Sequence, residues 1–141
     1  MTEAIRTPEV SAATSPVADN PQVRERLVAL QQEMGKEGGV VMEGRDITTV
    51  VFPDAEIPIY LDADPNVRAE RRYRELIAKG KDVTFEKTLN DLMERDRRDR
   101  ERPVGALTVA ERAKIVDTSH LSQEQVIEAL YEIVTNWMDK G

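Results

Sequence analysis

The chain of 141 residues contains no cysteine and a single histidine, His120. Without cysteine it has no disulfide framework, no thiolate zinc site and no cysteine nucleophile. One histidine is too few for a histidine-rich metal site, and the motifs HExxH, Gly-x-Ser-x-Gly and the EF-hand loop are absent. We therefore predict no metal ligands among the residues of this chain.

Long apolar runs are also lacking. Runs such as Val40–Met42 and Val50–Phe52 have three residues, whereas a membrane span needs ~20. The first residues show neither the basic nor the apolar region of a secretory signal. The 27 acidic residues outnumber the 20 basic ones, and the net charge of −7 argues against nucleic-acid binding through bulk positive charge. These observations predict a cytoplasmic protein of one domain that binds neither membranes nor nucleic acid.

The basic residues that are present are unevenly distributed. Nine of the 14 arginines lie between Arg68 and Arg102, a stretch with a net charge of +3, while the rest of the chain has −10. Arginine presents a planar fork that matches phosphate and carboxylate groups. Composition leaves two interpretations open, a solvated helix face with ion pairs four residues apart or a surface that binds phosphate.

Predicted helices alternate with short β runs along the chain. The β runs lie at 40–43, 57–61 and 114–117, and their alternation with helices predicts an α/β fold with a parallel sheet covered by helices. Three strands make a thin sheet. Capping residues predict helices that begin after Thr7, Asn20, Asp64, Thr84 and Ser122, with stops at Gly35, Gly80 and Pro103. The last helix is expected to bury one face that consists of Val126, Ile127, Leu130, Val134 and Trp137.

The helix that begins after Thr84 changes character along one face. Its apolar seam, which includes Leu89 and Leu92, continues at the same spacing to Asp96 and Asp99. A charge that faces inward is costly unless it is paired. The seam therefore indicates either a structural ion-pair cluster or a polar ligand site at the end of this helix.

Arginines accompany the last of these carboxylates. Arg95 and Arg102 flank Asp99 at i−4 and i+3, so the three side chains share one side of the helix. Gly44-Arg45-Asp46 follows the first β run, and ligands bind at the carboxyl ends of strands in open parallel sheets. An ordinary turn explains Gly44–Asp46 equally well, so this tripeptide alone is weak support for a ligand site.

Four stretches of the chain are distinctive in combination. They are IRTPEVSAATSPVADNPQVRERL at 5–27, VVMEGRDITTVVFPDA at 40–55, RAERRYREL at 68–76 and ERDRRDRER at 94–102. Together they resemble the corresponding stretches of bacterial cytidylate kinases. The resemblance covers nearly the whole chain.

This resemblance implies a P-loop nucleoside monophosphate kinase fold and a role in pyrimidine nucleotide metabolism. The implied reaction transfers the γ-phosphoryl group of ATP to CMP or dCMP with Mg²⁺. It also implies that Arg68, Arg71 and Arg72 belong to a lid over the transferring phosphates. The implied CMP-binding residues are Ser15, Arg24 and Asp46 around the cytosine, Arg45 near the phosphate, and Arg95, Asp99 and Arg102 on the sugar and phosphate.

The sequence departs from the family pattern in three places. Thr48 stands where glycine is usual, and 102–107 differs from the common Arg-x-x-Ala-Pro-Leu. Neither change removes a proposed ligand-binding side chain. The third departure is larger, because no P-loop pattern occurs and Met1 corresponds to an internal position of the family. The P-loop, the first strand and helix, and much of the monophosphate-binding insertion have no counterpart here.

The resemblance therefore predicts one partial domain over 1–141. Within it, 5–35 would end the monophosphate-binding region, 40–61 and 114–141 would form the core, and 68–102 would carry the lid and the arginine-rich helices. Two hypotheses follow. The chain is the C-terminal part of a cytidylate kinase, inactive alone because the P-loop is absent, or it is a non-catalytic half that binds pyrimidine nucleotides or complements a separate N-terminal half. An arginine-rich interaction protein unrelated to nucleotides would require the four motifs to coincide by accident.

Overall fold

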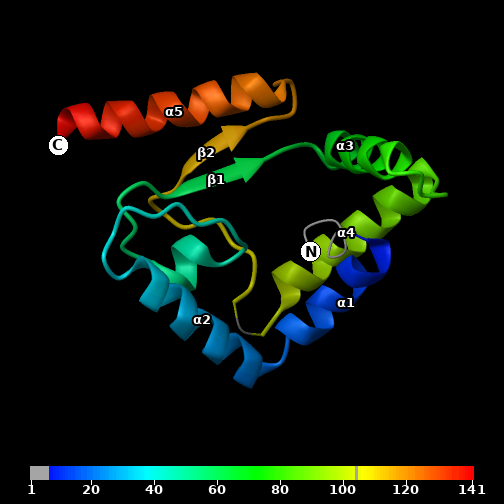
Figure 1. The fold of residues 1–141 in the computed structure, drawn as a ribbon, viewed down its shortest axis with the longest axis horizontal. Coiled ribbons are helices and arrows are strands. Elements are labelled where there is room, and N and C mark those ends of the chain that lie inside the picture. Colours follow the sequence, from blue (N-terminus) through cyan, green and yellow to red (C-terminus); the bar gives the residue numbers. More distant parts are fainter. Residues whose placement is uncertain (1–6, 104) are drawn as a thin grey trace. The chain divides into compact units, whose positions relative to one another are not determined.

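The computed structural model describes residues 7–103 and 105–141, apart from the side chain of Ser15. These residues form five α-helices, a short π-helix and a two-stranded parallel sheet (Figure 1). The chain divides into two compact units. The first contains the chain up to Asp54 together with Met93–Val109, and the second contains Ala55–Leu92 and Ala110–Gly141. No helix in the described ranges is both long enough and apolar enough to cross a membrane.

Two helices, α1 (Pro8–Ala18) and α2 (Pro21–Gly35), begin the first unit. Each has proline in its first turn, where the absent N–H leaves no bond unmade. The side chains of Thr7 and Asn20 accept hydrogen bonds from N–H groups of these first turns at 3.0–3.2 Å. Both predicted helix starts are confirmed, and the two helices diverge from the turn that joins them (Figure 1).

The segment Val40–Glu43, predicted to be a strand, does not form one. No backbone hydrogen bond joins it to another residue in the described part of the chain, and the Val41 side chain is fully exposed. A β-strand needs a neighbour to pair its N–H and C=O groups, and none of the described residues lies in that position. The described sheet therefore has two strands where the sequence predicted three.

A run of β-branched residues forms the π-helix η2 (Ile47–Val51), although such residues favour strands. The Val51 N–H donates to the Asp46 carbonyl at 3.1 Å, which is the i→i+5 bond of a π-helix. Ile47 and Val51 are buried, and Gln32 of α2 donates to the Val51 carbonyl at 3.1 Å. Packing against α2 thus overrides strand propensity, and η2 fixes Asp46 at its N-terminal end.

The second unit contains the sheet, formed by β1 (Ile59–Asp62) and β2 (Lys114–Asp117). The strands are parallel, with Ile59 opposite Lys114 and Asp62 opposite Asp117. Both strand predictions are confirmed, although β1 begins and ends slightly later than expected. Leu61 and Ile115 are more than half exposed, whereas parallel sheets are usually buried on both faces.

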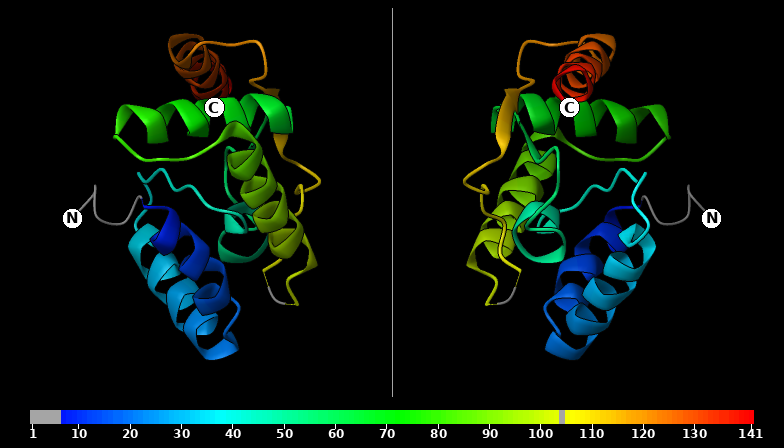
Figure 2. Two further views of the ribbon diagram at one scale, coloured as in Figure 1. Left: turned by 90° about the vertical axis from the view of Figure 1, so that its right-hand side faces the viewer. Right: turned by 90° about the vertical axis from the view of Figure 1, so that its left-hand side faces the viewer.

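Helix α3 (Pro65–Ala78) follows β1, and α5 (Gln123–Lys140) follows β2. The two helices run across each other: Figure 1 shows α5 along its length and α3 foreshortened, and Figure 2 shows the reverse. The Asp64 carboxylate caps α3 by accepting from the Asn66 N–H at 2.8 Å. Ser122 and Gln125 form the predicted capping box at the start of α5.

The expected burial of one face of α5 is wrong, because none of its five residues is buried. Ile127 and Trp137 are exposed, and Val126, Leu130 and Val134 are only half-buried. The sheet of two short strands offers too little surface to cover an 18-residue helix. The sequence of α5 is amphipathic, but the described residues leave its apolar face partly exposed.

Helix α4 (Phe85–Glu101) belongs to both units, with 85–92 in the second and 93–101 in the first. Thr84 caps it, as predicted, by accepting from the Lys87 N–H at 3.2 Å. The predicted change along its inward face is confirmed, because Asp96 and Asp99 are buried. The first unit thus buries charged groups at this end of α4.

Candidate functional site

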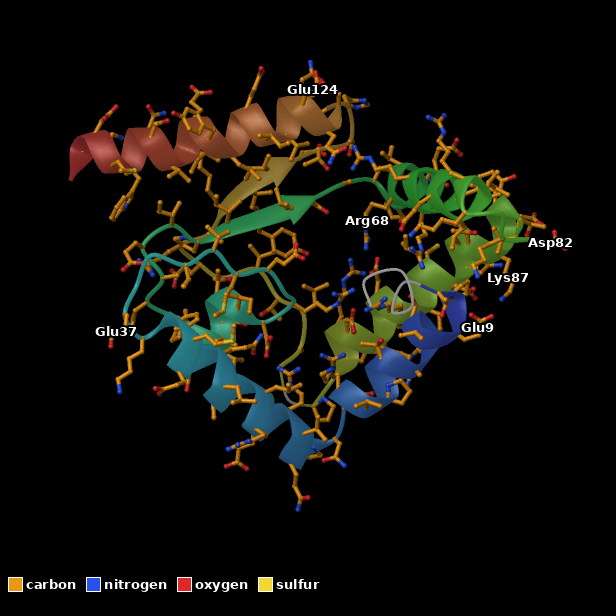
Figure 3. The ribbon with its side chains drawn as sticks, viewed as in Figure 1. Glu9, Glu37, Arg68, Asp82, Lys87 and Glu124 are labelled. Carbon is orange, nitrogen blue, oxygen red and sulfur yellow. The ribbon has the colours of Figure 1, made fainter. Side chains whose placement is uncertain are left out.

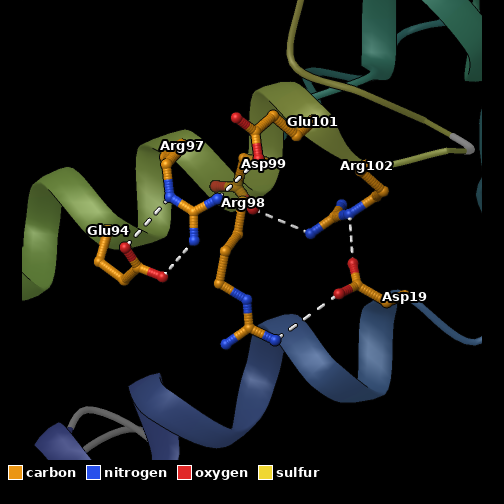
Figure 4. Close-up of polar contacts among 7 residues, drawn as sticks. All are labelled: Asp19, Glu94, Arg97, Arg98, Asp99, Glu101 and Arg102. Atoms are coloured by element: carbon orange, nitrogen blue, oxygen red, sulfur yellow. Dashed lines mark hydrogen bonds and ion pairs between the residues drawn. The ribbon is translucent and has the colours of Figure 1, made fainter.

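A buried carboxylate at the end of α4 holds two arginines from different segments. The Asp99 side chain is 1% exposed. Its Oδ2 lies 2.5 Å from Arg45 Nε, and its Oδ1 lies 2.9 Å from Nη2 of Arg102 one turn later. Two of the residues predicted from helical spacing, Asp99 and Arg102, are therefore in direct contact (Figure 4).

A second buried pair lies next to the first. The Arg24 guanidinium of α2 donates to the Asp46 carboxylate, and both side chains are more than nine-tenths buried. Because Arg45 and Asp46 are adjacent in the chain, the two pairs form one continuous cluster. Burial lowers the pKa of Arg24, as does the nearby charge of Arg102, while Asp19 raises it.

Gly105 closes one side of this cluster. It has a φ of 67°, a region that favours glycine, and a Cβ at this position would overlap the Arg24 guanidinium. The Leu107 N–H donates to the Asp99 carbonyl at 2.7 Å, which returns the loop after α4 to the helix. This loop is part of the stretch 102–107 that departs from the family pattern, and its residue Val104 lies outside the described residues.

Sequence reasoning missed one member of the cluster, Asp19, in the turn between α1 and α2. Its Oδ1 lies 2.8 Å from Nε of Arg102, and its Oδ2 lies 3.7 Å from Nη2 of Arg98 (Figure 4). Arg102 and Asp19 are 83 residues apart, and no local pattern marks an aspartate before Asn-Pro as a partner for α4. A positive-φ glycine such as Gly105 likewise has no distinct local signal.

The other residues predicted for CMP binding are placed as follows. Arg95 lies half-buried on α4, one residue before the buried Asp96. Ser15 lies in α1, and its side chain is outside the described part of the structure, as are Ile5 and Arg6 at the start of the 5–35 segment.

The three predicted lid arginines all lie on α3, in the second unit. Arg68 projects from the start of the helix (Figure 3). Arg72 pairs with Glu75 at 3.1 Å. Arg71 bridges to the loop after β2, where it donates to the Thr118 hydroxyl at 3.1 Å and to the Thr118 and Leu121 carbonyls at 2.5 and 3.3 Å.

The cluster of the first unit has the chemistry of an anion site. Its ion pairs join four arginines to three carboxylates, which leaves an excess of one positive charge. Among the described side chains, Arg24 Nε and Thr49 Oγ1 are buried without a hydrogen-bond partner. Buried donors normally have a partner, so Arg24 Nε, which belongs to the cluster, is a donor that a polar ligand or water would satisfy. Arginine forks and carboxylates together suit a ligand that carries both phosphate and hydroxyl or amine groups.

The sequence of this chain is similar to those of known proteins. The family model described as cytidylate kinase matches residues 1–136. The cytidylate kinase of Pelotomaculum thermopropionicum is 52% identical over 130 residues, which are 92% of this chain and 58% of that protein. That of Phocaeicola vulgatus is 52% identical over 120 residues, 85% of this chain and 52% of that protein. That of Chloroherpeton thalassium is 45% identical over 140 residues, 96% of this chain and 60% of that protein.

This chain thus spans between one half and two thirds of the length of these curated relatives, and the matched part includes almost all of its own residues. The buried arginine and aspartate residues described above fall within the matched range. The chain belongs to the cytidylate kinase family.

Proposed function

We propose that this chain carries the monophosphate-binding part and the lid of an enzyme that transfers the γ-phosphoryl group of ATP to CMP or dCMP. We infer that its helices and sheet form part of a P-loop nucleoside monophosphate kinase fold. The main support is the cluster that joins Arg24 to Asp46 and Asp99 to both Arg45 and Arg102. Buried ion pairs contribute little to stability, so binding of a ligand explains this group of five buried or half-buried charged side chains better than stabilisation does.

The roles follow from chemistry and from family membership. Asp46, an acceptor, and Arg24, a donor, suit the exocyclic amine and the ring edge of cytosine, together with the proposed contribution of Ser15. Arg45 and Arg102 suit the phosphate, because each guanidinium presents several N–H donors. Asp99 suits a sugar hydroxyl, as does the neighbouring Arg95. Phosphoryl transfer depends mainly on positioning and charge stabilisation, and these residues would supply the positioning of the acceptor.

We propose that this chain's residues alone do not hold ATP and Mg²⁺. The sequence has no Gly-x-x-x-x-Gly-Lys-Ser/Thr loop, and in the described ranges no group of three or more metal-ligating side chains lies together. Arg68, Arg71 and Arg72 would neutralise phosphate charge when a lid closes, but arginines do not replace a cradle of backbone N–H groups. We therefore propose that ATP and Mg²⁺ bind mainly to polypeptide outside these 141 residues.

The open sheet favours an additional role as a complementing half. Val41 is fully exposed, and Leu61 and Ile115 of the strands are more than half exposed. A polypeptide that carries a P-loop and its preceding strand would cover apolar groups of this kind and complete the parallel sheet. The alternative is a non-catalytic pyrimidine-nucleotide-binding protein. Turnover after addition of a P-loop half separates these two, since a non-catalytic binder would bind CMP and still produce no CDP.

Calorimetric titration tests the proposed acceptor site directly. CMP should bind, and AMP should bind far more weakly, because the proposed base-reading residues match cytosine. Arg102→Ala should weaken CMP binding by about 1.5–3 kcal/mol, the range for a charge-assisted hydrogen bond. Arg97→Ala is the matched control, because it removes an exposed arginine of the same helix that pairs with Glu94 and Glu101. Equal CMP affinity for wild type and Arg102→Ala would contradict the assignment.

A further inference from the structure

Asp19 differs from the other carboxylates of the cluster in its exposure. Its side chain is 34% exposed, against 8% for Asp46 and 1% for Asp99. Its partner Arg102 is itself only 4% exposed. Asp19 therefore lies at the solvent edge of the cluster, where it pairs with an arginine that is otherwise enclosed.

Each contact of Asp19 uses a single carboxylate oxygen. It accepts from Arg102 through a single oxygen at 2.8 Å, and its other oxygen is 3.7 Å from Arg98, beyond hydrogen-bond distance. Neither contact is the two-bond fork that makes arginine–carboxylate pairs strong. A partly exposed carboxylate that leaves such a pair returns to water at little cost, whereas Asp46 and Asp99 would have to leave a buried environment.

Charge balance indicates what could take its place. With Asp19 engaged, the seven side chains joined by these ion pairs carry one net positive charge, and without it they carry two. A phosphate monoester at neutral pH carries about two negative charges and three acceptor oxygens. Arg98 and Arg102, both held by Asp19, would then be available to one dianion.

We infer that Asp19 is an internal competitor, a carboxylate that occupies Arg102 and Arg98 until the phosphate of a nucleoside monophosphate displaces it. This inference rests on the proposed function, since it concerns the affinity of that same site. Asp19 then limits affinity, and the α1–α2 turn is released from α4 when the ligand binds. A purely structural Asp19 would instead hold Arg102 in its binding position, and its loss would weaken binding.

The variant Asp19→Asn separates these two roles, because it keeps the shape and the acceptor oxygen and removes the charge. Calorimetry with CMP and with inorganic phosphate should show binding about three- to tenfold tighter than wild type at the same ionic strength. The control Asp91→Asn makes the same chemical change in an exposed pair with Lys87 and should leave both affinities unchanged. In wild type, the Arg102 Nε–H resonance should shift when CMP is added, as its carboxylate partner is exchanged for phosphate.

The outcomes distinguish this inference from the proposed function. CMP binding to wild type with equal or weaker binding to Asp19→Asn would overturn the competitor role and leave the proposed function standing. Failure of both proteins to bind CMP or phosphate would contradict both. Tighter binding of phosphate and CMP alike by Asp19→Asn, with Asp91→Asn unchanged, would support the displacement of Asp19 by the phosphate group.

Discussion

The guanidinium of Arg24 packs against Gly105 so closely that no side chain fits between them. Gly105→Ala should therefore push Arg24 away from Asp46 and weaken CMP binding about tenfold or more, equivalent to ~1.4 kcal/mol. It should also cost about 1–2 kcal/mol of stability because φ is 67°. Calorimetry and urea unfolding measure the two effects.

Gly80→Ala provides the matched control for this substitution. Gly80 has a φ of 74°, yet nothing lies within 4 Å of the position where its Cβ would be. It should lose a similar amount of stability and keep the CMP affinity of wild type. If both alanine variants bind CMP as wild type does, Gly105 has no role in placing Arg24.

Asp99→Asn should lower the free energy of unfolding by about 3–5 kcal/mol, because it leaves two arginines without their buried carboxylate. Arg45 and Arg102 contact opposite oxygens of Asp99, and an amide can accept from only one of them. Asp91→Asn, an exposed control on the same helix, should change the stability by less than about 0.5 kcal/mol. Urea unfolding that gives equal stabilities for the two variants would refute the importance of the shared carboxylate.

Arg71→Lys tests the contact between α3 and the loop after β2. Lysine keeps the charge but lacks the two-nitrogen fork with which Arg71 donates to the Thr118 hydroxyl through Nη1 and to the Thr118 and Leu121 carbonyls through Nη2. The variant should lose about 1–3 kcal/mol in thermal or urea unfolding. Arg74→Lys alters only an exposed pair with Glu70 and should be close to wild type. A stable Arg71→Lys protein would mean that the bridge contributes nothing to the second unit.

Ser119, in the loop after β2, lowers the pKa of the Asp117 carboxyl. Its hydroxyl, 2.6 Å from Asp117, and then its N–H, at 2.9 Å, hold the pKa of that carboxyl below the ordinary 3.8. Because the pKa of Asp117 is lower in the folded state, its carboxylate stabilises the fold at pH values above the ordinary 3.8. This stabilisation is lost as the pH falls through the folded pKa. In an NMR titration, Ser119→Ala should raise the Asp117 pKa toward 3.8. Ser122→Ala, which removes the α5 cap, should leave it unchanged.

Activity gives the last prediction. The purified 141-residue chain, incubated with ATP, Mg²⁺ and CMP, should form no CDP above background, because it has no P-loop pattern to hold the transferring phosphates. Addition of the N-terminal part of a curated relative, in trans or fused upstream, should restore turnover. A coupled assay that shows CMP-dependent ADP production by the chain alone would contradict this prediction.

Local chemistry made the helix boundaries predictable. Asn20 and Ser122 cap helices through bonds to residues two and three positions away, so their signals are contained in a few letters of sequence. The burial of the Asp99 side chain was likewise predictable, because its position continues the helical spacing of the apolar seam. The predicted strand 40–43 failed because pairing depends on a neighbour, which an apolar run does not reveal.

The partners of the buried charges could not be predicted from the residues alone. Asp19 meets Arg102 across 83 positions, and Arg45 meets Asp99 across 54. The π-helix η2, which follows Asp46, consists of β-branched residues, and such residues favour strands. Both features depend on tertiary packing. Resemblance to a family pointed to Arg24, whereas Arg45 was also suggested by its position after the first predicted β run.

The two compact units are interleaved along the chain, since each is assembled from two separate stretches. A single break anywhere between residues 55 and 109 therefore interrupts at least one unit and separates its stretches. The first unit also closes only after the first stretch of the second, Ala55–Leu92, has been synthesised, which makes its contacts non-local and its folding slow relative to a helical hairpin. When segments are exchanged between relatives, by recombination or by design, the two interleaved units should therefore be exchanged together rather than one at a time.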